Sequence, residues 1–356
     1  MIFINGRFLT QRTTGVQRFA LEVIKYLDKQ TKMKFTILVP KNCTISYEFN
    51  NIKIQQIGKL SGHIWEQLEL PIYTKRNILI NLCNTAPMFK KNQIVVIHDA
   101  AVYASSQGFS FSFRVWYKTL FYFIKIFTRT ILTISEFSKK ELLEYINIDP
   151  KKVNIISEGK EHFDKIDENP EVLTKFNLEE GKYVLAVSSY NPNKNFKALV
   201  EATEYLNHKD FEIVIAGGTD LRVFNKNIIE SENIKKLGYV TDEDLKGLYK
   251  NAGCFVFPSV YEGFGLPPLE AMSTGCPTLV SNVGPMPEVS GDAAIYFNPN
   301  DSKEIAEKIN YVMKNDKLRS EMGVKGLEQS KKFSWELAAK QLIDAVASLD
   351  KKNFDI

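Results

Sequence analysis

Short apolar runs alternate with longer segments of helical periodicity along almost the whole chain. Continuous apolar runs are typical of parallel strands that are buried on both faces, and the periodic segments between them are typical of amphipathic helices. The pattern therefore predicts an α/β fold in both halves of the chain. The predicted strands are residues 1–5, 35–39, 78–82, 94–98 and 131–134 in the first half, and 183–188, 211–216, 234–237, 254–257, 278–281 and 294–297 in the second.

The chain is long enough for two domains, because 356 residues exceed the usual size of a single one. The stretch at 164–171 is polar, charged and interrupted by proline, so we place the interdomain linker there. We predict a first domain at 1–165 and a second at 170–335. The last predicted helix covers about 334–349, and we assign the segment 336–356 to it.

Charge is divided unequally between the two halves. Residues 1–165 contain 24 Lys and Arg against 13 Asp and Glu, a net charge of +11, whereas the remainder carries −7. Opposite signs indicate two domains with different partners. The basic half suits anionic lipid or a lipid-diphosphate acceptor. Its cations are scattered and no nucleic-acid-binding signature is present, so we expect no nucleic acid partner.

The cysteines and the N-terminus indicate the compartment. Cys43, Cys83, Cys254 and Cys276 form no CxxC pair, which argues against a zinc site or a disulfide framework and predicts buried free thiols in a reducing environment. The first residues lack the basic and apolar regions of a signal peptide and match a first strand instead. We therefore expect a cytoplasmic protein.

Residues 109–129 combine nine aromatic residues with four cations. Arg114, Lys118, Lys125 and Arg129 are spaced so that a helix places them on one face. Charges interrupt every apolar stretch before the length of about 18 residues that spans a bilayer. Two interpretations stay open. The helix lies at a membrane interface with its basic side toward lipid phosphates, or it packs on the sheet with its cations reaching into solvent.

The segment Glu262-Gly-Phe-Gly-Leu-Pro-Pro-Leu-Glu270 has the most informative chemistry in the chain. It follows the predicted strand 254–257, and open α/β sheets bind ligands at the carboxyl ends of their strands. Gly263 and Gly265 allow a ligand to approach the main chain, and a helix that starts at Leu269 would present N–H groups to a phosphate. A carboxylate on each side can accept hydrogen bonds from the hydroxyls of a sugar and of a ribose. The segment therefore indicates a nucleotide-sugar site.

This segment resembles the signature of family 4 glycosyltransferases, which are retaining enzymes of GT-B fold. The resemblance covers most of residues 2–335 and is specific for the family, although it does not identify the sugar. It implies two Rossmann-like α/β/α domains that face each other across a cleft, and transfer of a sugar from a nucleoside-diphosphate donor. The first domain is expected to bind the acceptor and the second the nucleotide-sugar donor. By the same resemblance, the C-terminal helix at 336–356 is expected to cross back onto the first domain. Further matching segments are Thr14–Ala20, Ile134–Lys139, Ala271–Pro277, Pro287–Ala294 and Phe297–Asp301.

The same resemblance assigns roles to residues of the first half. Gly15 lies in the loop after the first strand, where the family places it against the donor diphosphate and the acceptor. His98 ends the strand 94–98, and the family commonly has a histidine there that contacts the donor sugar. Asp99 is expected to orient His98 or to bind a hydroxyl.

Lys194 follows the predicted strand 183–188 and is expected to neutralise the donor diphosphate. The family often has an arginine five residues before this lysine, where this chain has Ser189. A hydroxyl supplies one donor and no charge, so more of the neutralisation falls to Lys194. Arg12 and Arg18 are the candidates that would compensate.

The remaining donor contacts are expected in the second half. By resemblance, Glu262 accepts from the hydroxyls of the donor sugar, and Glu270 accepts from both ribose hydroxyls. Retention in this family is usually explained by front-face attack, so Glu262 is not expected to be a nucleophile; His98 and Glu262 are the predicted catalytic residues. The other predicted donor-binding residues are Gly238 and Tyr239 near the base, and Gly263, Phe264, Gly265 and Leu266 at the distal phosphate.

Asp242-Glu243-Asp244 matches the metal-binding DxD pattern of the other large glycosyltransferase fold. Thr241 precedes it as a typical N-cap, and acidic residues in a first helical turn favour the helix dipole. A helix start explains these residues without a ligand. We therefore predict no essential metal and no other cofactor.

The sequence thus predicts a retaining, metal-independent hexosyltransferase in bacterial surface-polysaccharide synthesis, such as that of O-antigen, capsule or lipopolysaccharide. The donor is a nucleotide sugar with UDP, GDP or dTDP as its nucleotide, and the acceptor is a glycan or a lipid-diphosphate-linked glycan. The basic first half and the resemblance favour a peripheral position on the inner face of the cytoplasmic membrane. Two alternatives stay open, a GT-B nucleotide-sugar epimerase and a non-catalytic nucleotide-sugar-binding subunit.

Overall fold

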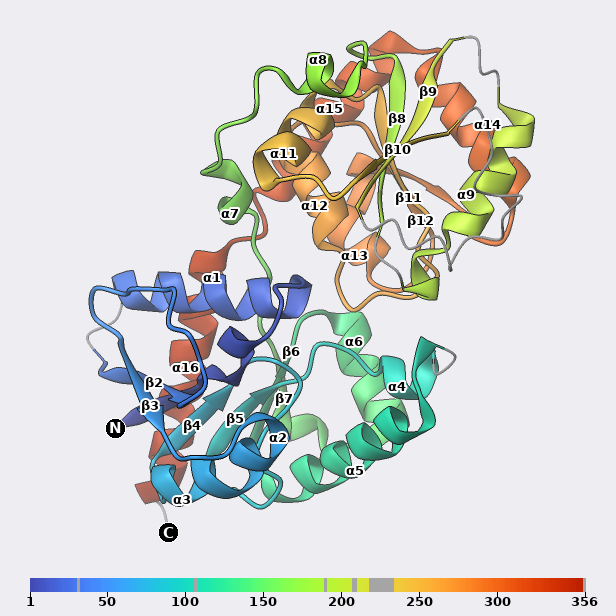
Figure 1. Ribbon diagram of the computed structural model, residues 1–356. Coiled ribbons are helices and arrows are strands. Elements are labelled where there is room, and N and C mark those ends of the chain that lie inside the picture. The colour runs from blue at the N-terminus through green and yellow to red at the C-terminus, as the bar shows by residue number, and fades with distance from the viewer. Residues whose placement is uncertain (31–32, 106–107, 189–190, 207–209, 218–233, 355–356) are drawn as a thin grey trace. The chain divides into compact units, whose positions relative to one another are not determined.

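The chain forms two compact units, each built around one parallel sheet (Figure 1). Unit 1 comprises Met1–Gly159 and Ser334–Ile356, and unit 2 comprises Lys160–Phe333. The predicted α/β class with two Rossmann-like domains is confirmed. The computed structural model describes residues 1–30, 33–105, 108–188, 191–206, 210–217 and 234–354.

The sheet of unit 1 has the strand order β3-β2-β1-β4-β5-β6-β7, and all its paired strands are parallel. The chain winds outward from β1 in one direction and then from β4 in the other, so these two neighbours mark the point where the winding reverses. The strands are β1 (Ile2–Asn5), β2 (Phe35–Pro40), β3 (Lys53–Ile57), β4 (Ile78–Asn81), β5 (Gln93–Val96), β6 (Thr130–Thr133) and β7 (Val153–Ile155).

The sheet of unit 2 repeats this winding in the order β10-β9-β8-β11-β12-β13 and is also parallel. Here the reversal falls between β8 and β11. The strands are β8 (Tyr183–Ser188), β9 (Glu212–Gly217), β10 (Ile234–Gly238), β11 (Cys254–Phe257), β12 (Thr278–Ser281) and β13 (Ala294–Phe297).

Helices cover the sheets. In unit 1, a wider π-helical turn (Trp65–Glu69) joins α2 to α3, so the chain is helical from residue 62 to residue 74. The helices of unit 1 are α1 (Gly15–Gln30), α2 (Gly62–Ile64), α3 (Leu70–Thr74), α4 (Ala101–Ala104), α5 (Phe111–Phe127), α6 (Glu136–Glu141) and α16 (Trp335–Phe354). Those of unit 2 are α7 (Glu161–Asp164), α8 (Val172–Phe176), α9 (Phe196–Ala202), α11 (Asp242–Asn251), α12 (Leu266–Ser273), α13 (Met286–Ser290), α14 (Ser302–Met313) and α15 (Asp316–Ser330).

Two strands of unit 1 were not predicted. β3 has the polar sequence Lys-Ile-Gln-Gln-Ile and is mostly exposed, and β7 has only three residues. Both lie at the ends of the sheet, where one neighbour is missing and no long apolar run is needed. Continuous apolar runs therefore identify the central strands and miss these edges.

The boundary between the units falls after Gly159, upstream of the predicted linker at 164–171. That polar stretch belongs to unit 2 and is bound to α11. The side chain of Lys246 donates to the backbone oxygens of Asp164 and Ile166, and the backbone N–H of Asn169 donates to the backbone oxygen of Glu243. The polar residues at 164–171 therefore do not mark a free linker, because this stretch is hydrogen-bonded to α11.

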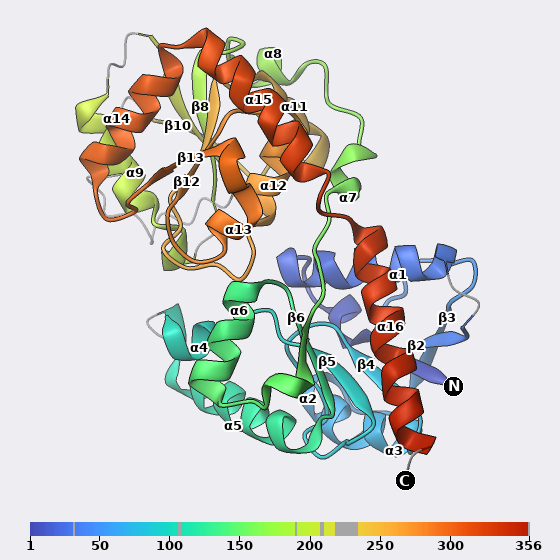
Figure 2. The same ribbon diagram turned by 180° about the vertical axis from the view of Figure 1, so that it is seen from behind.

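The C-terminal helix α16 belongs to unit 1, where it packs beside α1 (Figure 2). Trp335, at its first position, is fully buried, and its ring meets that of Phe19 edge-on at 5.8 Å between centroids. Gln341 accepts a hydrogen bond from the backbone N–H of Ser157 at 2.7 Å. The last helix therefore completes the core of the first unit.

Helix α5, within the segment 109–129, packs on the core of unit 1 through Leu120, Phe121 and Ile124. Two of its predicted cations turn toward the protein. Lys118 lies over the ring of Tyr103, and Lys125 donates to the backbone oxygen of residue 146. The packing matches the second of the two interpretations, and the opposite side of α5 is exposed.

The four cysteines are free, as the sequence predicted; Cys83 is half-buried and the others are buried. Within the described ranges, no helix has both the length and the apolarity needed to cross a bilayer.

Candidate functional site

The reversal point of unit 2 brings two predicted site residues together. Lys194 follows β8 in a short helical turn, and Glu262 lies in the loop after β11. The Lys194 ammonium donates to the Glu262 carboxylate at 2.6 Å, with both side chains largely buried. The ammonium also lies 5.0 Å from the ring centroid of Phe257. A cation and a carboxylate are therefore paired where such sheets bind ligands.

Backbone hydrogen bonds hold the two loops in register. The N–H of Val260 donates to the oxygen of Asn193 at 2.8 Å. Asn195, which has a positive φ of 52°, donates through its side chain to the oxygens of Pro258 at 3.1 Å and Pro299 at 2.7 Å. These bonds tie the residues around Lys194 to the loop that carries Glu262, so the pair is positioned by main chain.

The turn that follows requires glycine at one position. Gly265 has a φ of 112°, and a Cβ there would lie 2.5 Å from the terminal carbon of Met286. Gly263 has no positive φ. Helix α12 begins at Leu266, three residues before the predicted start, because prolines are tolerated in a first turn whose N–H groups have no partner within the helix.

We expect Gly265→Ala to lower the free energy of unfolding by about 1–3 kcal/mol, since a left-handed conformation and a close contact both oppose a side chain there. Urea unfolding of unit 2 measures the loss. Gly263→Ala is the matched control and should cost clearly less. Equal losses in the two variants would contradict the role given to Gly265.

Glu270 lies on α12 and is paired with a residue that the sequence did not single out. His162, on α7, lies 2.9 Å from the Glu270 carboxylate through Nε2, and both side chains are buried. The serine at 273 donates to the backbone oxygen of Glu270 at 2.8 Å. One carboxylate oxygen of Glu270 is thus oriented by His162.

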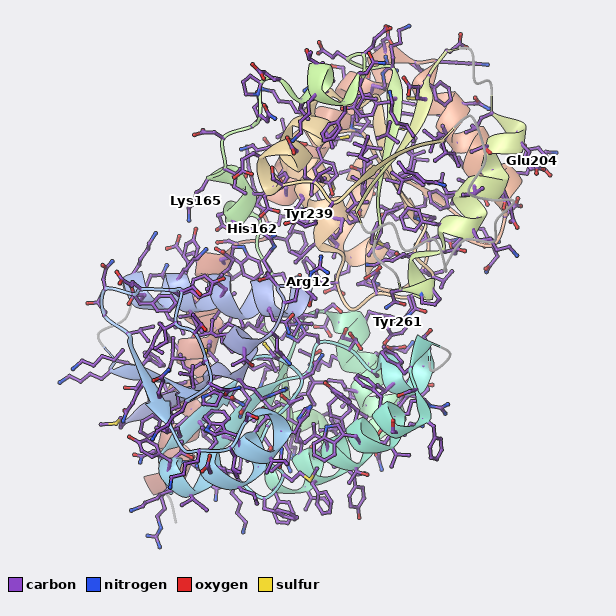
Figure 3. All side chains as sticks on the ribbon, viewed as in Figure 1. Arg12, His162, Lys165, Glu204, Tyr239 and Tyr261 are labelled. Carbon is purple, nitrogen blue, oxygen red and sulfur yellow. The ribbon has the colours of Figure 1, made fainter. Side chains whose placement is uncertain are left out.

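The other predicted donor contacts of unit 2 differ in exposure. Tyr239 is 78% exposed beside Gly238, which ends β10 with a φ of 71° (Figure 3). The ring of Phe264 is buried against Phe333, so only its backbone is placed to meet a ligand. Ser189 lies outside the described residues.

The DxD segment forms the start of α11. Thr241 accepts from the backbone N–H of Asp244 at 3.2 Å and caps the helix. Burial opposes ionisation of Asp244, but hydrogen bonds from Lys175 and Asn169 outweigh it and hold the pKa of Asp244 below its usual value. In the part of the chain that the structure describes, no group of three His, Cys, Asp or Glu is arranged to hold a metal ion.

In unit 1, His98 is buried directly after β5. Its Nε2–H donates to the oxygen of Leu82 at 2.9 Å, and its ring meets Phe19 edge-on. Burial lowers the pKa of His98 to about 4, so the imidazole is neutral at neutral pH. The carboxylate nearest to its Nδ1 is that of Glu158, at 3.9 Å. Asp99 accepts from the backbone N–H of Ala101 at the start of α4.

The loop before α1 contains the other predicted residues of unit 1. Gly15 is the first residue of α1, and Arg12 is exposed (Figure 3). Thr14 and Gln17 bond each other, and the Gln17 side chain accepts from the Thr14 backbone N–H, as in a capping box. Arg18 is half-buried on the first turn of α1.

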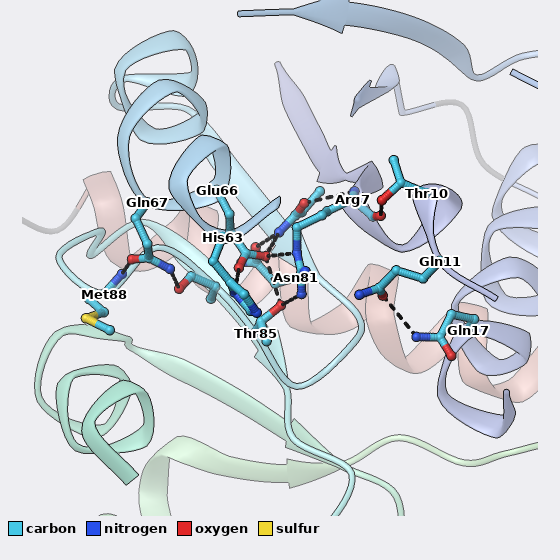
Figure 4. A network of polar contacts seen from close by, with 12 residues as sticks. Arg7, Thr10, Gln11, Gln17, His63, Glu66, Gln67, Asn81, Thr85 and Met88 are labelled. Carbon is cyan, nitrogen blue, oxygen red and sulfur yellow. Dashed lines mark hydrogen bonds and ion pairs between the residues drawn. The ribbon is translucent and has the colours of Figure 1, made fainter. Parts of the chain in front are cut away.

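A buried polar network occupies the reversal point of unit 1 (Figure 4). The Glu66 carboxylate is fully buried and accepts from Arg7 at 3.2 Å, Asn5 at 2.7 Å and Thr85 at 2.8 Å. Burial opposes its ionisation, but these bonds and one to His63 hold the pKa of Glu66 below its usual value. The network fixes the carboxyl ends of β1 and β4.

Sequence reasoning missed His162, Glu158 and this network. Arg7 stands two residues after a predicted strand, which is a usable signal, whereas Glu66 lies on a helix with no strand beside it in the sequence. Pairings across more than 50 residues leave no local pattern.

Comparison with known proteins finds similarity to glycosyl transferases, and the matched family model lies within unit 2. A model of the family described as Glycosyl transferases group 1 matches residues 168–329. The O-antigen chain mannosyltransferase B of Escherichia coli is 36% identical over 229 residues, which are 61% of this chain and 60% of that protein. The serotype-specific mannosyltransferase WbdA of Escherichia coli is 34% identical over 234 residues, 62% of this chain and 29% of that protein. The matched regions thus span 60% and 29% of these relatives.

Solved structures share the fold over the whole chain. Anabaena HepE, solved in complex with UDP and glucose, has a TM-score of 0.74 at 13% identity and covers 98% of this chain and 99% of that one. Together with the two winding sheets, this similarity shows that the fold is GT-B, as the sequence predicted.

Proposed function

We propose that this chain, whose residues 168–329 match the model of the group 1 glycosyl transferases, transfers a hexose from a nucleoside-diphosphate sugar to a glycan or lipid-linked acceptor. Its relatives are named as O-antigen and serotype-specific mannosyltransferases, so mannose is the first sugar to test and surface polysaccharide the first product class. Unit 2 binds the donor and unit 1 the acceptor.

The pairing of Lys194 with Glu262 carries this proposal. At 2.6 Å the two groups lie within one hydrogen bond of each other, after the two strands at which the winding of unit 2 reverses. A diphosphate needs a cation as the leaving group gains charge, and a sugar needs acceptors for its hydroxyls. The pair supplies both, and α12 follows with backbone N–H groups at Gly265 and Leu266.

The stereochemical course that we propose is retention without a metal. Glu262 is paired with Lys194. This pairing is consistent with a carboxylate that orients sugar hydroxyls and does not act as a nucleophile. Front-face attack needs only that the departing phosphate oxygen takes the proton of the acceptor hydroxyl, so the protein positions the two reactants and excludes water. The Lys175 and Asn169 contacts of Asp244 support the metal-independent reading.

We expect Glu270→Ala to weaken binding of the nucleoside diphosphate about 10- to 100-fold, because charge-assisted hydrogen bonds contribute about 1.5–3 kcal/mol each. Isothermal titration calorimetry measures this loss. Glu321→Ala, an exposed carboxylate on α15, is the control and should leave the affinity unchanged. If Glu270→Ala bound the free nucleotide as tightly as the unaltered protein, the ribose role would be excluded.

The function is tested in two steps with the whole protein. Thermal unfolding is followed with UDP, GDP or dTDP, with Mg²⁺ or EDTA; a ligand of the folded state raises Tm by mass action. The donor sugar carrying the stabilising nucleotide is then incubated with and without a lipid-linked glycan. Acceptor-dependent glycan extension with retained configuration supports the proposal. A donor isomerised without acceptor identifies an epimerase, and binding without either reaction identifies a non-catalytic subunit.

A further inference from the structure

The helix at 62–74 of unit 1 presents apolar side chains to solvent. Ile64, Leu68 and Ile72 are spaced four residues apart, so they form one row along the helix, and they are 61%, 55% and 72% exposed. The other side of the same helix buries Trp65 and Leu70 in the core. Single exposed apolar residues need no explanation, but a continuous row indicates a binding surface.

Helix 62–74 is in contact with α5, which has exposed apolar side chains of its own. His63 meets Trp116 of α5 with ring centroids 5.0 Å apart. Phe89, which is 68% exposed, packs against Phe123 at 5.0 Å and Phe127 at 5.5 Å. The outward side of α5 is itself apolar, with Phe111, Val115, Tyr122 and Ile126 exposed. We call the outward rows of helix 62–74 and α5, together with Phe89, the apolar face.

A basic hollow adjoins the apolar face at Phe89. It has a volume of about 1180 Å³ and lies entirely within unit 1. Burial lowers the pKa of Lys90 to about 8, and this lysine donates to the backbone oxygen of Lys75. Among the residues whose side chains the structure describes, no acid lines the hollow. Its cations are Lys34, Lys75, Arg76, Lys90, Lys91 and Arg129.

The surrounding charge is almost entirely of one sign. The segments 59–76, 86–92 and 110–129 contain nine Lys and Arg against two Asp and Glu. Both acids are already engaged: Glu66 is buried with Arg7, and Glu69 accepts from the backbone N–H groups of residues 59 and 60, which precede its own helix. The face therefore combines exposed apolar rows with an excess of positively charged residues.

We propose that the apolar face and the basic hollow together bind the surface of an anionic lipid bilayer. The apolar rows enter the boundary between headgroups and acyl chains, and the hollow receives lipid phosphates. A second copy of the chain fits this surface less well, since two faces of the same positive sign repel each other.

The orientation differs from the one expected from sequence. The basic side of α5 was the candidate for lipid contact, yet Lys118 and Lys125 face other parts of unit 1. Contact with lipid is assigned instead to the outward row of α5, to helix 62–74, which the sequence analysis did not single out, and to the hollow. This inference does not depend on the proposed reaction.

The test is flotation of the whole protein with vesicles of phosphatidylglycerol and phosphatidylethanolamine, and with vesicles of phosphatidylcholine alone. We expect at least tenfold more protein on the anionic vesicles, and loss of most of this excess in about 1 M NaCl, where the Debye length is about 3 Å. Two triple variants are each expected to reduce binding at least tenfold: Ile64→Ser with Leu68→Ser and Ile72→Ser, and Lys75→Glu with Arg76→Glu and Lys91→Glu.

Matched triple variants in unit 2 control for lost apolar area and lost charge, and each should stay within twofold of the unaltered protein. Thermal unfolding verifies that all variants fold. Equal binding to neutral and anionic vesicles, or loss of binding in the controls as well, overturns the proposal. One further result overturns it: the unaltered protein is a dimer that does not bind lipid, and the triple variant at Ile64, Leu68 and Ile72 is a monomer. That result would assign the face to a second copy of the chain. The control substitutions are Tyr205→Ser, Tyr311→Ser and Val324→Ser, and Lys197→Glu, Lys317→Glu and Lys331→Glu.

Discussion

Replacement of Lys194 by methionine is expected to lower kcat/KM for sugar transfer about 100- to 1000-fold, the usual effect of removing one preorganised donor from a site of developing negative charge. Methionine keeps the approximate length of the side chain and removes the ammonium, together with its contacts to Glu262 and to the ring of Phe257. The expected effect is large because the chain has Ser189, with no charge of its own, where the family often has an arginine. Steady-state kinetics measure this loss of kcat/KM, with the donor sugar whose nucleotide raises the Tm of the protein.

Lys197→Met is the matched control, since Lys197 is 74% exposed and is paired only with Glu201 in the described structure. The double variant Lys194→Met, Glu262→Gln adds a second test. The two groups bond each other, so their effects should be far from additive. Strict additivity, or full activity of Lys194→Met, would remove Lys194 from the site.

Replacement of Glu66 by glutamine is expected to lower the free energy of unfolding of unit 1 by about 3–5 kcal/mol, because Arg7 then stays buried without its carboxylate. Urea unfolding followed by tryptophan fluorescence measures this change, since Trp65, Trp116 and Trp335 all belong to unit 1. The exposed pair Lys331 and Glu328 supplies the control, and Glu328→Gln should change stability by less than about 1 kcal/mol.

The pH dependence of stability gives an independent test of the Glu66 network. The folded pKa of Glu66 lies below its usual value, so its ionised form stabilises unit 1 above the unfolded pKa of about 4.3. This contribution is lost as the pH falls through the lower, folded pKa. The Glu66→Gln protein should lack this part of the acid-induced loss. An unchanged acid dependence would show that Glu66 is not ionised in the folded protein.

Much of the fold follows from the sequence because the central strands are buried on both faces. β8 and β11, for example, are continuous apolar runs, and their ends predict where the loops that carry Lys194 and Glu262 begin. The two side chains meet because β8 and β11 are neighbours in the sheet. This neighbourhood depends on the strand order, which the local sequence pattern does not reveal.

Other features depend on contacts that no local pattern records. The partner of Glu270 is a histidine 108 residues earlier in the chain, on a helix of four residues. Edge strand β3 is polar because one of its faces meets solvent. The exposed row of helix 62–74 resembles an ordinary core-facing stripe in sequence, and only the structure shows that Trp65 and Leu70 fill the core while Ile64 and Ile72 stay outside.

The return of α16 to unit 1 makes unit 2 an insertion within a discontinuous domain. During synthesis, every residue of unit 2 leaves the ribosome before α16 does. Unit 2 therefore has all its own contacts available cotranslationally, whereas unit 1 waits for Trp335 to cover Phe19. The half of the chain made first is the half whose folding is finished last, and until then its α1 surface needs protection from aggregation.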